Sequence, residues 1–359
     1  MKPTRSWTTG LGLKTLATLL LSTFLMSCGS SKKYDEFMPT RILSIGDAMS
    51  YMSFSAGEAT NTLTSVDPAT GKPNHWLTVL GAKYGRYSVG DSPSNAYDIV
   101  FINNSNYRMG LASPCNTSPN SAWPSRCSLG TYDDIEAQAN KLFQLIPDPR
   151  SGDLVVMTIG MGDVFELADT AFGRGDDASS STELNAAKSV GVKYINLADR
   201  LYQHGFKHVL LLYGIDQSKT PYATTKSLKY RENLANLTKS LNNGVNINCK
   251  GGCSEGDNKP YSSRAEGVWR AGDIYAYLLN ITNGTSVNLR ANINNNTIPN
   301  TSTSPLCLFP STLSSCTPNG LNDSSGLPYF FSGDLYLTPT LHSIVGNFIY
   351  NFARSNAGF

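Results

Sequence analysis

Short, almost continuously apolar runs recur along the chain and are separated by longer mixed stretches. The clearest run covers residues 154 to 159, and similar runs cover 41 to 45, 97 to 102 and 208 to 212. A strand that is apolar at nearly every position is typical of a parallel sheet covered on both faces. The pattern therefore predicts buried parallel strands, and a further short strand is expected at Val268-Trp269.

The stretches between these runs carry apolar residues at helical spacing. They predict helices over residues 74 to 84, 132 to 146, 183 to 204, 226 to 241 and 340 to 352, with another helix beginning at Asp273. Strands that alternate with helices in this way predict an α/β fold with right-handed crossovers. No Pro-rich or charged linker divides the chain, so one domain is expected.

Polar or glycine-rich turns follow three of the predicted strands. They are Gly46-Asp47, Asn103 to Asn106, and Gly160 to Asp163. Ligands of parallel sheets bind beyond the carboxyl ends of the strands. These turns are therefore expected to meet along one crevice. The Asn-, Thr- and Ser-rich region from 280 to 303 is predicted to be a surface excursion.

The N-terminal residues have the profile of a signal peptide. Basic residues precede an apolar run from Leu16 to Met26, which is too short to span a bilayer as a stable helix. The run ends in Leu25-Met26-Ser27-Cys28, which resembles the bacterial lipobox. Cys28 could instead be an ordinary residue near a cleavage site, but the Gly-Ser-Ser-Lys-Lys segment after it suits a flexible tether.

The lipobox resemblance implies that Cys28 is acylated, for example with palmitate, and becomes the mature N-terminus. Gly29 follows it rather than an aspartate, which favours the outer membrane over the inner membrane. We therefore expect a lipoprotein signal peptide over residues 1 to 27, a lipidated tether over 28 to 40, and one domain over 41 to 359, held at the bacterial cell envelope.

Charge excludes one class of partner, and the cysteines indicate the redox compartment. The formal net charge is +2 and charged residues make up 16% of the chain, so nucleic acid is not an expected partner. No cofactor or metal is expected either. Apart from Cys28, six cysteines form three close pairs, which in an exported chain suggests local disulfides. Zinc is the alternative, but no histidine lies beside these cysteines at ligand spacing. The pairs are Cys115 with Cys127, Cys249 with Cys253, and Cys307 with Cys316, among fifteen pairings that the sequence allows.

Several blocks across most of the mature chain resemble the SGNH or GDSL family of ester hydrolases, which includes esterases, lipases and acyltransferases. These blocks are the strand through Gly46-Asp47, Ile159 to Asp163, Tyr213 to Pro221, the late cysteine pair with Tyr329 to Phe331, and the helix from Thr338 to Tyr350. The resemblance implies a three-layer α/β/α sandwich with a mostly parallel sheet of flavodoxin-like topology. It also implies a serine nucleophile, an oxyanion hole and a histidine base.

The residues that carry hydrolysis in this family are replaced here. Ala48 stands at the nucleophilic serine, Ser105 or Asn106 at an oxyanion glycine, and Gly162 at the oxyanion asparagine. In the last block, a gapless match places Tyr336 at the catalytic histidine and Gly333 at the aspartate. A shift by one residue keeps Asp334 as the aspartate but puts Leu337 at the histidine. Either register removes the base.

Four polar residues remain beside these positions, and each has an ordinary structural interpretation. Asp47 and Asp163 at strand-end turns would satisfy backbone donors. Asp334 is retained in only one register, and His342 matches a second, non-catalytic histidine of the family. A displaced nucleophile at Ser50, paired with His342, is disfavoured because two residues move the hydroxyl by several ångströms.

Three functions follow from these observations. The leading hypothesis is a pseudoenzyme: an envelope lipoprotein that keeps the esterase-like scaffold, has lost hydrolysis, and binds acyl, glycan or protein ligands. The alternative is an active ester hydrolase or acyltransferase that uses rearranged residues such as Ser50. The third is a structural envelope lipoprotein whose crevice is filled by large side chains.

Overall fold

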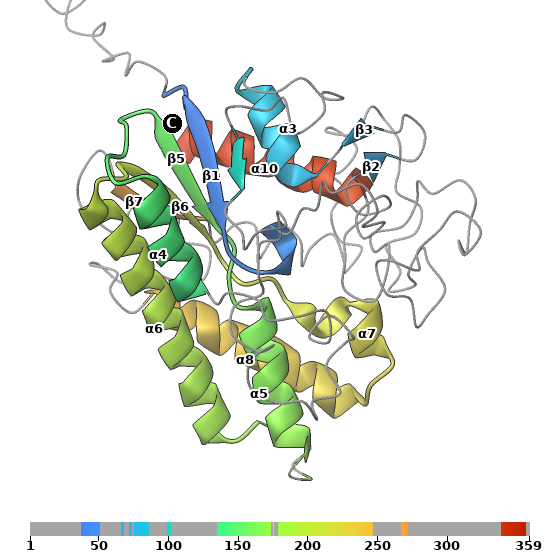
Figure 1. Cartoon of the computed structure of the whole chain (residues 1–359). Coiled ribbons are helices and arrows are strands. Elements are labelled where there is room, and N and C mark those ends of the chain that lie inside the picture. The colour runs from blue at the N-terminus through green and yellow to red at the C-terminus, as the bar shows by residue number, and fades with distance from the viewer. Residues whose placement is uncertain are drawn as a thin grey trace, which may run out of the picture.

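The protein has a mixed α/β fold built on one five-stranded sheet (Figure 1). The computed structural model describes residues 37–50, 66–67, 72–73, 75–85, 99–101, 135–173, 175, 179–246, 267–271 and 339–356. The strands of the sheet are β1 (Arg41–Ile45), β4 (Ile99–Phe101), β5 (Asp153–Met157), β6 (His208–Leu212) and β7 (Gly267–Ala271). Every neighbouring pair is parallel. The predicted parallel α/β arrangement is therefore confirmed.

The order of the strands creates a switch point between β1 and β5. The sheet runs β4-β1-β5-β6-β7, so the chain leaves β1 toward one edge and later returns to its other side. The register pairs Ser44 with Val156 and Ile45 with Met157. It continues past the strand ends, where the Thr158 amide donates to the Ile45 carbonyl at 3.2 Å. This is the place at which ligands of open α/β sheets bind.

Helices cover both faces of the sheet. On one face, α3 (Trp76–Lys83) packs against α10 (Pro339–Asn356). The other face carries α4 (Ile135–Leu145), α6 (Ser181–His204) and their neighbours (Figure 1). Alternate strand residues such as Leu43, Val155 and Val209 share one core with this second group of helices. The residues between them, Ile42, Leu154 and Leu210, are also fully buried, as the apolar pattern predicts.

Two long helices, α6 and α8 (Leu228–Asn246), make the closest helix contact of the second face. A Cβ atom added at Gly191 would lie 2.0 Å from the Leu241 carbonyl oxygen, and one added at Gly244 would lie 2.0 Å from that of Lys188. Only glycine permits this approach. A capping box starts α6, in which Ser180 Oγ accepts from the Thr182 amide and Glu183 accepts from the Ser180 amide. The helix therefore begins before the predicted Glu183.

The largest difference from the sequence prediction lies after β5, where only a turn was expected. A helix, α5 (Met161–Gly173), begins inside the predicted turn, directly after Gly160. Its buried residues Val164, Phe165, Ala168 and Ala171 have helical spacing, a pattern hidden by the glycines before it. The strand accordingly ends at Met157 rather than residue 159. Two further short helices, η6 (Gln217–Lys219) and α7 (Pro221–Thr224), also occupy a predicted turn.

The remaining differences are local. The sequence pattern did not predict the small antiparallel pair of β2 (Val66–Asp67) and β3 (Lys72–Pro73). Helices α8 and α10 both extend further than predicted, to Asn246 and Asn356. Within the described ranges, no helix has both the length and the apolar character needed to cross a membrane.

Several predictions concern residues outside the described ranges. They are the acylation of Cys28, the three cysteine pairs, the turn from 103 to 106, the helix at Asp273, the surface excursion from 280 to 303, and the last-block residues Gly333, Asp334, Tyr336 and Leu337. They remain predictions from the sequence.

Candidate functional site

The turn after β1 is fixed by its glycine. Gly46 has a φ of 143°, and a Cβ atom there would lie 2.2 Å from the Thr158 carbonyl oxygen. A side-chain amide from α4 clamps the same residue: the Gly46 amide donates to Gln138 Oε1 at 2.8 Å, and Gln138 Nε2 donates to the Gly46 carbonyl at 3.1 Å. The turn at the expected nucleophile position is therefore held by Thr158, the residue after β5, and by Gln138 of α4.

Asp47 follows this glycine and ties three segments together. Its Oδ1 atom accepts from the Met49 amide at 3.0 Å, and its Oδ2 atom accepts from the Met161 amide at 3.2 Å. Its own amide donates to Thr158 Oγ1 at 3.2 Å. The side chain is 2% exposed, and this burial raises the pKa of the carboxyl. Asp47 thus satisfies backbone donors of the turn and of the first residue of α5.

The residues after Asp47 form a single 3-10 turn, η1 (Ala48–Ser50). Ala48, at the expected nucleophile position, begins this turn. Ser50 ends it, fully buried, with its Oγ atom 2.6 Å from Thr158 Oγ1. The Ser50 amide donates to the Asp47 carbonyl at 3.0 Å. The Ser50 hydroxyl is therefore engaged with Thr158.

A pair of buried histidines lies behind η1. The ring of His342, on α10, stacks at 4.4 Å from the ring of His75, the residue that caps α3. His75 Nδ1 accepts from the Leu77 amide, so its Nε2 carries the proton that it shares with the Met49 carbonyl at 3.0 Å. The same carbonyl accepts from Trp76 Nε1 at 2.7 Å. The histidines therefore support η1 from the α3 and α10 face.

The electrostatics of this pair disfavour a catalytic base. Burial lowers the pKa of His342 to about 3. Burial, with the neighbouring His342, also lowers the pKa of His75 well below its usual value. Within the described residues, His342 Nδ1 has no hydrogen-bond partner, and Ser50 hydrogen-bonds to Thr158 rather than to His342. The displaced Ser50 and His342 pair is thus not formed.

Asp163 lies in the first turn of α5, next to Gly162. Its Oδ2 atom accepts a short hydrogen bond from the Tyr194 hydroxyl of α6. Burial raises the pKa of Asp163 to about 7, and the nearby carboxyls of Glu166 and Asp47 add to this increase. The role of Asp163 differs from the predicted one. Asp163 lies in helix α5 and accepts from the side chain of Tyr194, whereas the sequence predicted that it would accept from backbone amides of a turn.

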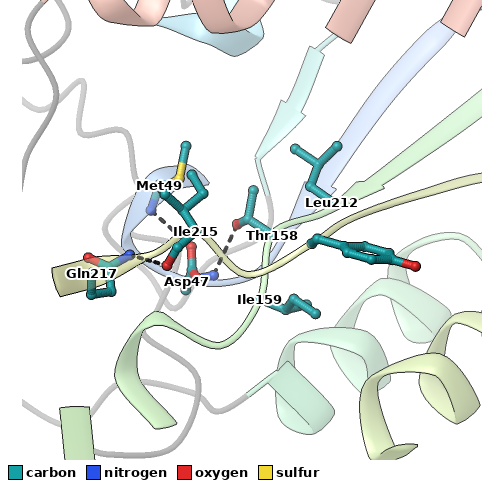
Figure 2. A pocket seen from close by; sticks show the side chains of 8 residues that line it. Asp47, Met49, Thr158, Ile159, Leu212, Ile215 and Gln217 are labelled. Carbon is teal, nitrogen blue, oxygen red and sulfur yellow. Dashed lines mark hydrogen bonds between the residues drawn. The ribbon is translucent and has the colours of Figure 1, made fainter. Parts of the chain in front are cut away.

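Among the described residues, the space at the carboxyl ends of β1, β5 and β6 is small. Figure 2 shows a small cavity lined by Asp47, Thr158 and the apolar side chains of Met49, Ile159 and Leu212. It has room for about one water molecule. A second amide clamp holds the segment after β6, where Asn242 of α8 pairs with both the amide and the carbonyl of Gly214 at 2.9 and 3.0 Å. The part of the chain that the structure describes contains no cluster of ligating side chains suited to a metal ion.

The structure thus brings together some of the predicted site residues and adds others. Asp47, Ser50 and the start of α5 meet at the switch point, as expected for strand-end turns. No local pattern marks Gln138, Thr158 or Tyr194 as a site residue, since each looks like an ordinary polar residue of a helix or strand. Only the β1–β5 register and the crossing of α4 and α6 bring them to the site.

The chain matches no model of a protein family, and no curated protein matches it.

Proposed function

We propose that this chain is a lipid-anchored envelope protein that keeps the scaffold of the SGNH or GDSL ester hydrolases and no longer hydrolyses esters. The observation that carries the proposal is the strand-end turn. Its scaffold contacts through Gly46 and Asp47 are complete, while Ala48 supplies no nucleophile.

The arrangement of the sheet supports the scaffold part of the proposal. Numbered along the chain, the five parallel strands lie in the order 2-1-3-4-5. This is the order of flavodoxin-like folds, whose ligands bind at the switch point between the first and third strands. The resemblance at Gly46-Asp47 and at Ile159 to Asp163 falls on the two sides of that switch point.

The chemistry of the described residues supports the loss of hydrolysis. Acyl transfer by this route needs an activated hydroxyl, a base to accept its proton, and donors for the oxyanion. Ser50 is buried against Thr158, and the low pKa of His342 makes it a poor proton acceptor. Removing one member of such a catalytic set already costs several orders of magnitude in rate.

The small volume of the described cavity at the strand ends favours a structural role for this protein over the binding of a ligand in a cleft. Met49, Ile159 and Leu212 occupy the strand-end space, and no substrate-sized cavity opens beside Asp47 among the described residues. Ligand sites commonly measure a few hundred Å³ or more. We therefore favour the structural envelope lipoprotein over a binder of acyl or glycan ligands, with another envelope component as its unidentified partner.

Ester hydrolysis tests the loss of activity. The purified mature protein is given p-nitrophenyl acetate and p-nitrophenyl octanoate, and a fluorophosphonate probe is used to label any activated serine. We expect turnover equal to buffer and no labelled serine. The matched Ser50→Ala variant separates the alternatives, because turnover that this substitution abolishes would establish an active hydrolase with a displaced nucleophile.

Metabolic labelling tests the anchor. Cells that express the full chain are grown with an alkynyl palmitate, and incorporation is compared between the native chain and Cys28→Ala. We expect label on the native chain only. Equal labelling of both proteins, or of neither, would show that Cys28 is not the acylated residue.

A further inference from the structure

We infer that the amino-terminal edge of the sheet is the membrane-facing surface of this protein, and that the edge carrying Asp47 points away from the bilayer. The inference rests on the lipid anchor proposed for Cys28. It assigns a surface and a partner, the lipid bilayer, that the loss of hydrolysis does not require.

The first described residues dock firmly at that edge. The ring of Phe37 stacks on the ring of His208, the first residue of β6, with centroids 3.7 Å apart. Three residues later, the Thr40 amide donates to the Gly152 carbonyl at 2.7 Å. A Cβ atom at Gly152 would lie 2.5 Å from Thr40 Oγ1, so the glycine allows this close approach. The chain therefore enters the domain at the amino ends of β5 and β6.

An ion pair locks the next residue in place. Arg41 Nε and Nη2 donate to the two carboxylate oxygens of Asp153 at 2.7 and 2.6 Å. Asp153 is fully buried and also accepts from the Arg150 amide at 2.8 Å. A bidentate pair of this kind fixes direction as well as distance. The attachment point is thus part of the rigid fold and does not move independently of the sheet.

The opposite edge lies far from this attachment point. All five strands run away from it, and α5 continues in the same general direction beyond β5 (Figure 1). The five residues of β5 and the thirteen of α5 together extend about 35 Å along their axes. Among the described residues, Phe172, near the end of α5, therefore marks the far end, and Arg150 marks the near edge.

The length of the tether sets how far the domain can turn. Phe37 comes nine residues after Cys28, a distance that a chain can span by at most about 30 Å and that a flexible chain spans on average by about 17 Å. A domain turned over, with Phe172 at the bilayer, would place Phe37 about 35 Å away, beyond that reach. A fully inverted domain is therefore excluded, and we expect the near edge to lie closer to the lipid than the far end.

Energy transfer to the bilayer tests this orientation. The lipidated full chain is reconstituted into vesicles of phosphatidylethanolamine and phosphatidylglycerol that carry an acceptor dye on the headgroups. A fluorescent amino acid is introduced at Arg150 or at Phe172, two exposed positions, without adding a cysteine. We expect at least about twofold greater transfer from position 150, because about 35 Å separates the two sites along β5 and α5.

A longer tether provides the control. Inserting about twenty Gly and Ser residues after Lys33 should lower the transfer from position 150 and reduce the difference between the sites. Equal or greater transfer from position 172 in the native chain would overturn the orientation while leaving the anchor intact. A chain that is not retained on the vesicles because Cys28 carries no lipid would overturn the proposed anchor, and the orientation with it.

Discussion

The Oγ atom of Ser50 lies 2.6 Å from the Oγ1 atom of Thr158, and both side chains are buried at the carboxyl ends of β1 and β5. Thr158 also accepts from the Asp47 amide, so the three residues form one small network across the switch point. The hydroxyl that could have replaced a missing nucleophile is a structural link between two strands.

Removal of this link should reduce stability without changing activity. Ser50→Ala deletes a buried hydrogen bond, so we expect the free energy of unfolding to fall by about 1–2 kcal/mol. Urea denaturation measures the change, and a cycle with Thr158→Val separates the pair from its surroundings. The two substitutions should be non-additive by about 0.5–1 kcal/mol. Full additivity would show that the two hydroxyls do not interact.

Loss of the amide clamp on Gly46 should lower the free energy of unfolding more than loss of the hydrogen bond between Ser50 and Thr158. Gln138→Leu leaves the buried amide and carbonyl of Gly46 without partners, which should cost about 2–4 kcal/mol. The control is Gln138→Glu measured at about pH 4, where a protonated carboxyl can accept from the Gly46 amide and donate to its carbonyl, and should cost less. An equal loss for both variants in chemical denaturation would argue against the paired clamp.

Asp163 should make stability decrease as pH rises. Its pKa of about 7 in the folded protein exceeds the ordinary aspartate value of 3.8, so the folded state retains a proton that the unfolded state releases. The stability contribution is complete below pH 4, declines between pH 4 and about 7, and stays low above that range. Asp163→Asn still accepts from Tyr194 and should flatten this slope. The raised pKa of Asp47 acts in the same direction and leaves a residual slope.

His342 should have the opposite dependence. Its pKa of about 3 lies below the ordinary histidine value of 6.5, so its contribution to stability is complete above pH 6.5 and is lost as pH falls toward 3. His342→Leu removes the group that the folded state must keep neutral beside His75. The variant should therefore gain stability relative to the native chain when pH is lowered from 8 to 5. An identical difference at both pH values in thermal denaturation would contradict this.

The sequence predicts the parallel sheet well because buried parallel strands are apolar at nearly every position. His208–Leu212 coincides with its predicted range, since Lys207 and Tyr213 lie at clear changes of pattern. Helix α5 was missed because the glycines at 160 and 162 resemble a turn. Gly160 has a positive φ, which changes the direction of the chain so that helix α5 begins at the next residue.

The candidate site is less predictable than the fold because its contacts come from distant segments. Asp47 could be found from its place after a strand, and its bond to the Met161 amide joins residues 114 positions apart. Nothing local marks Gln138 as the partner of Gly46, or Tyr194 as the partner of Asp163. Such partners follow from helix crossing, which periodicity does not specify.

The most direct test of the central claim is hydrolysis by the Ala48→Ser variant. The substitution restores a hydroxyl at the expected nucleophile position and leaves Gly46, Asp47 and the rest of the chain unchanged. Because the proposed resemblance implies that the base and the oxyanion asparagine are replaced as well, we predict no turnover of p-nitrophenyl butyrate above the native protein. Appreciable turnover by this single variant would show that the catalytic machinery is intact apart from position 48, and would contradict the account.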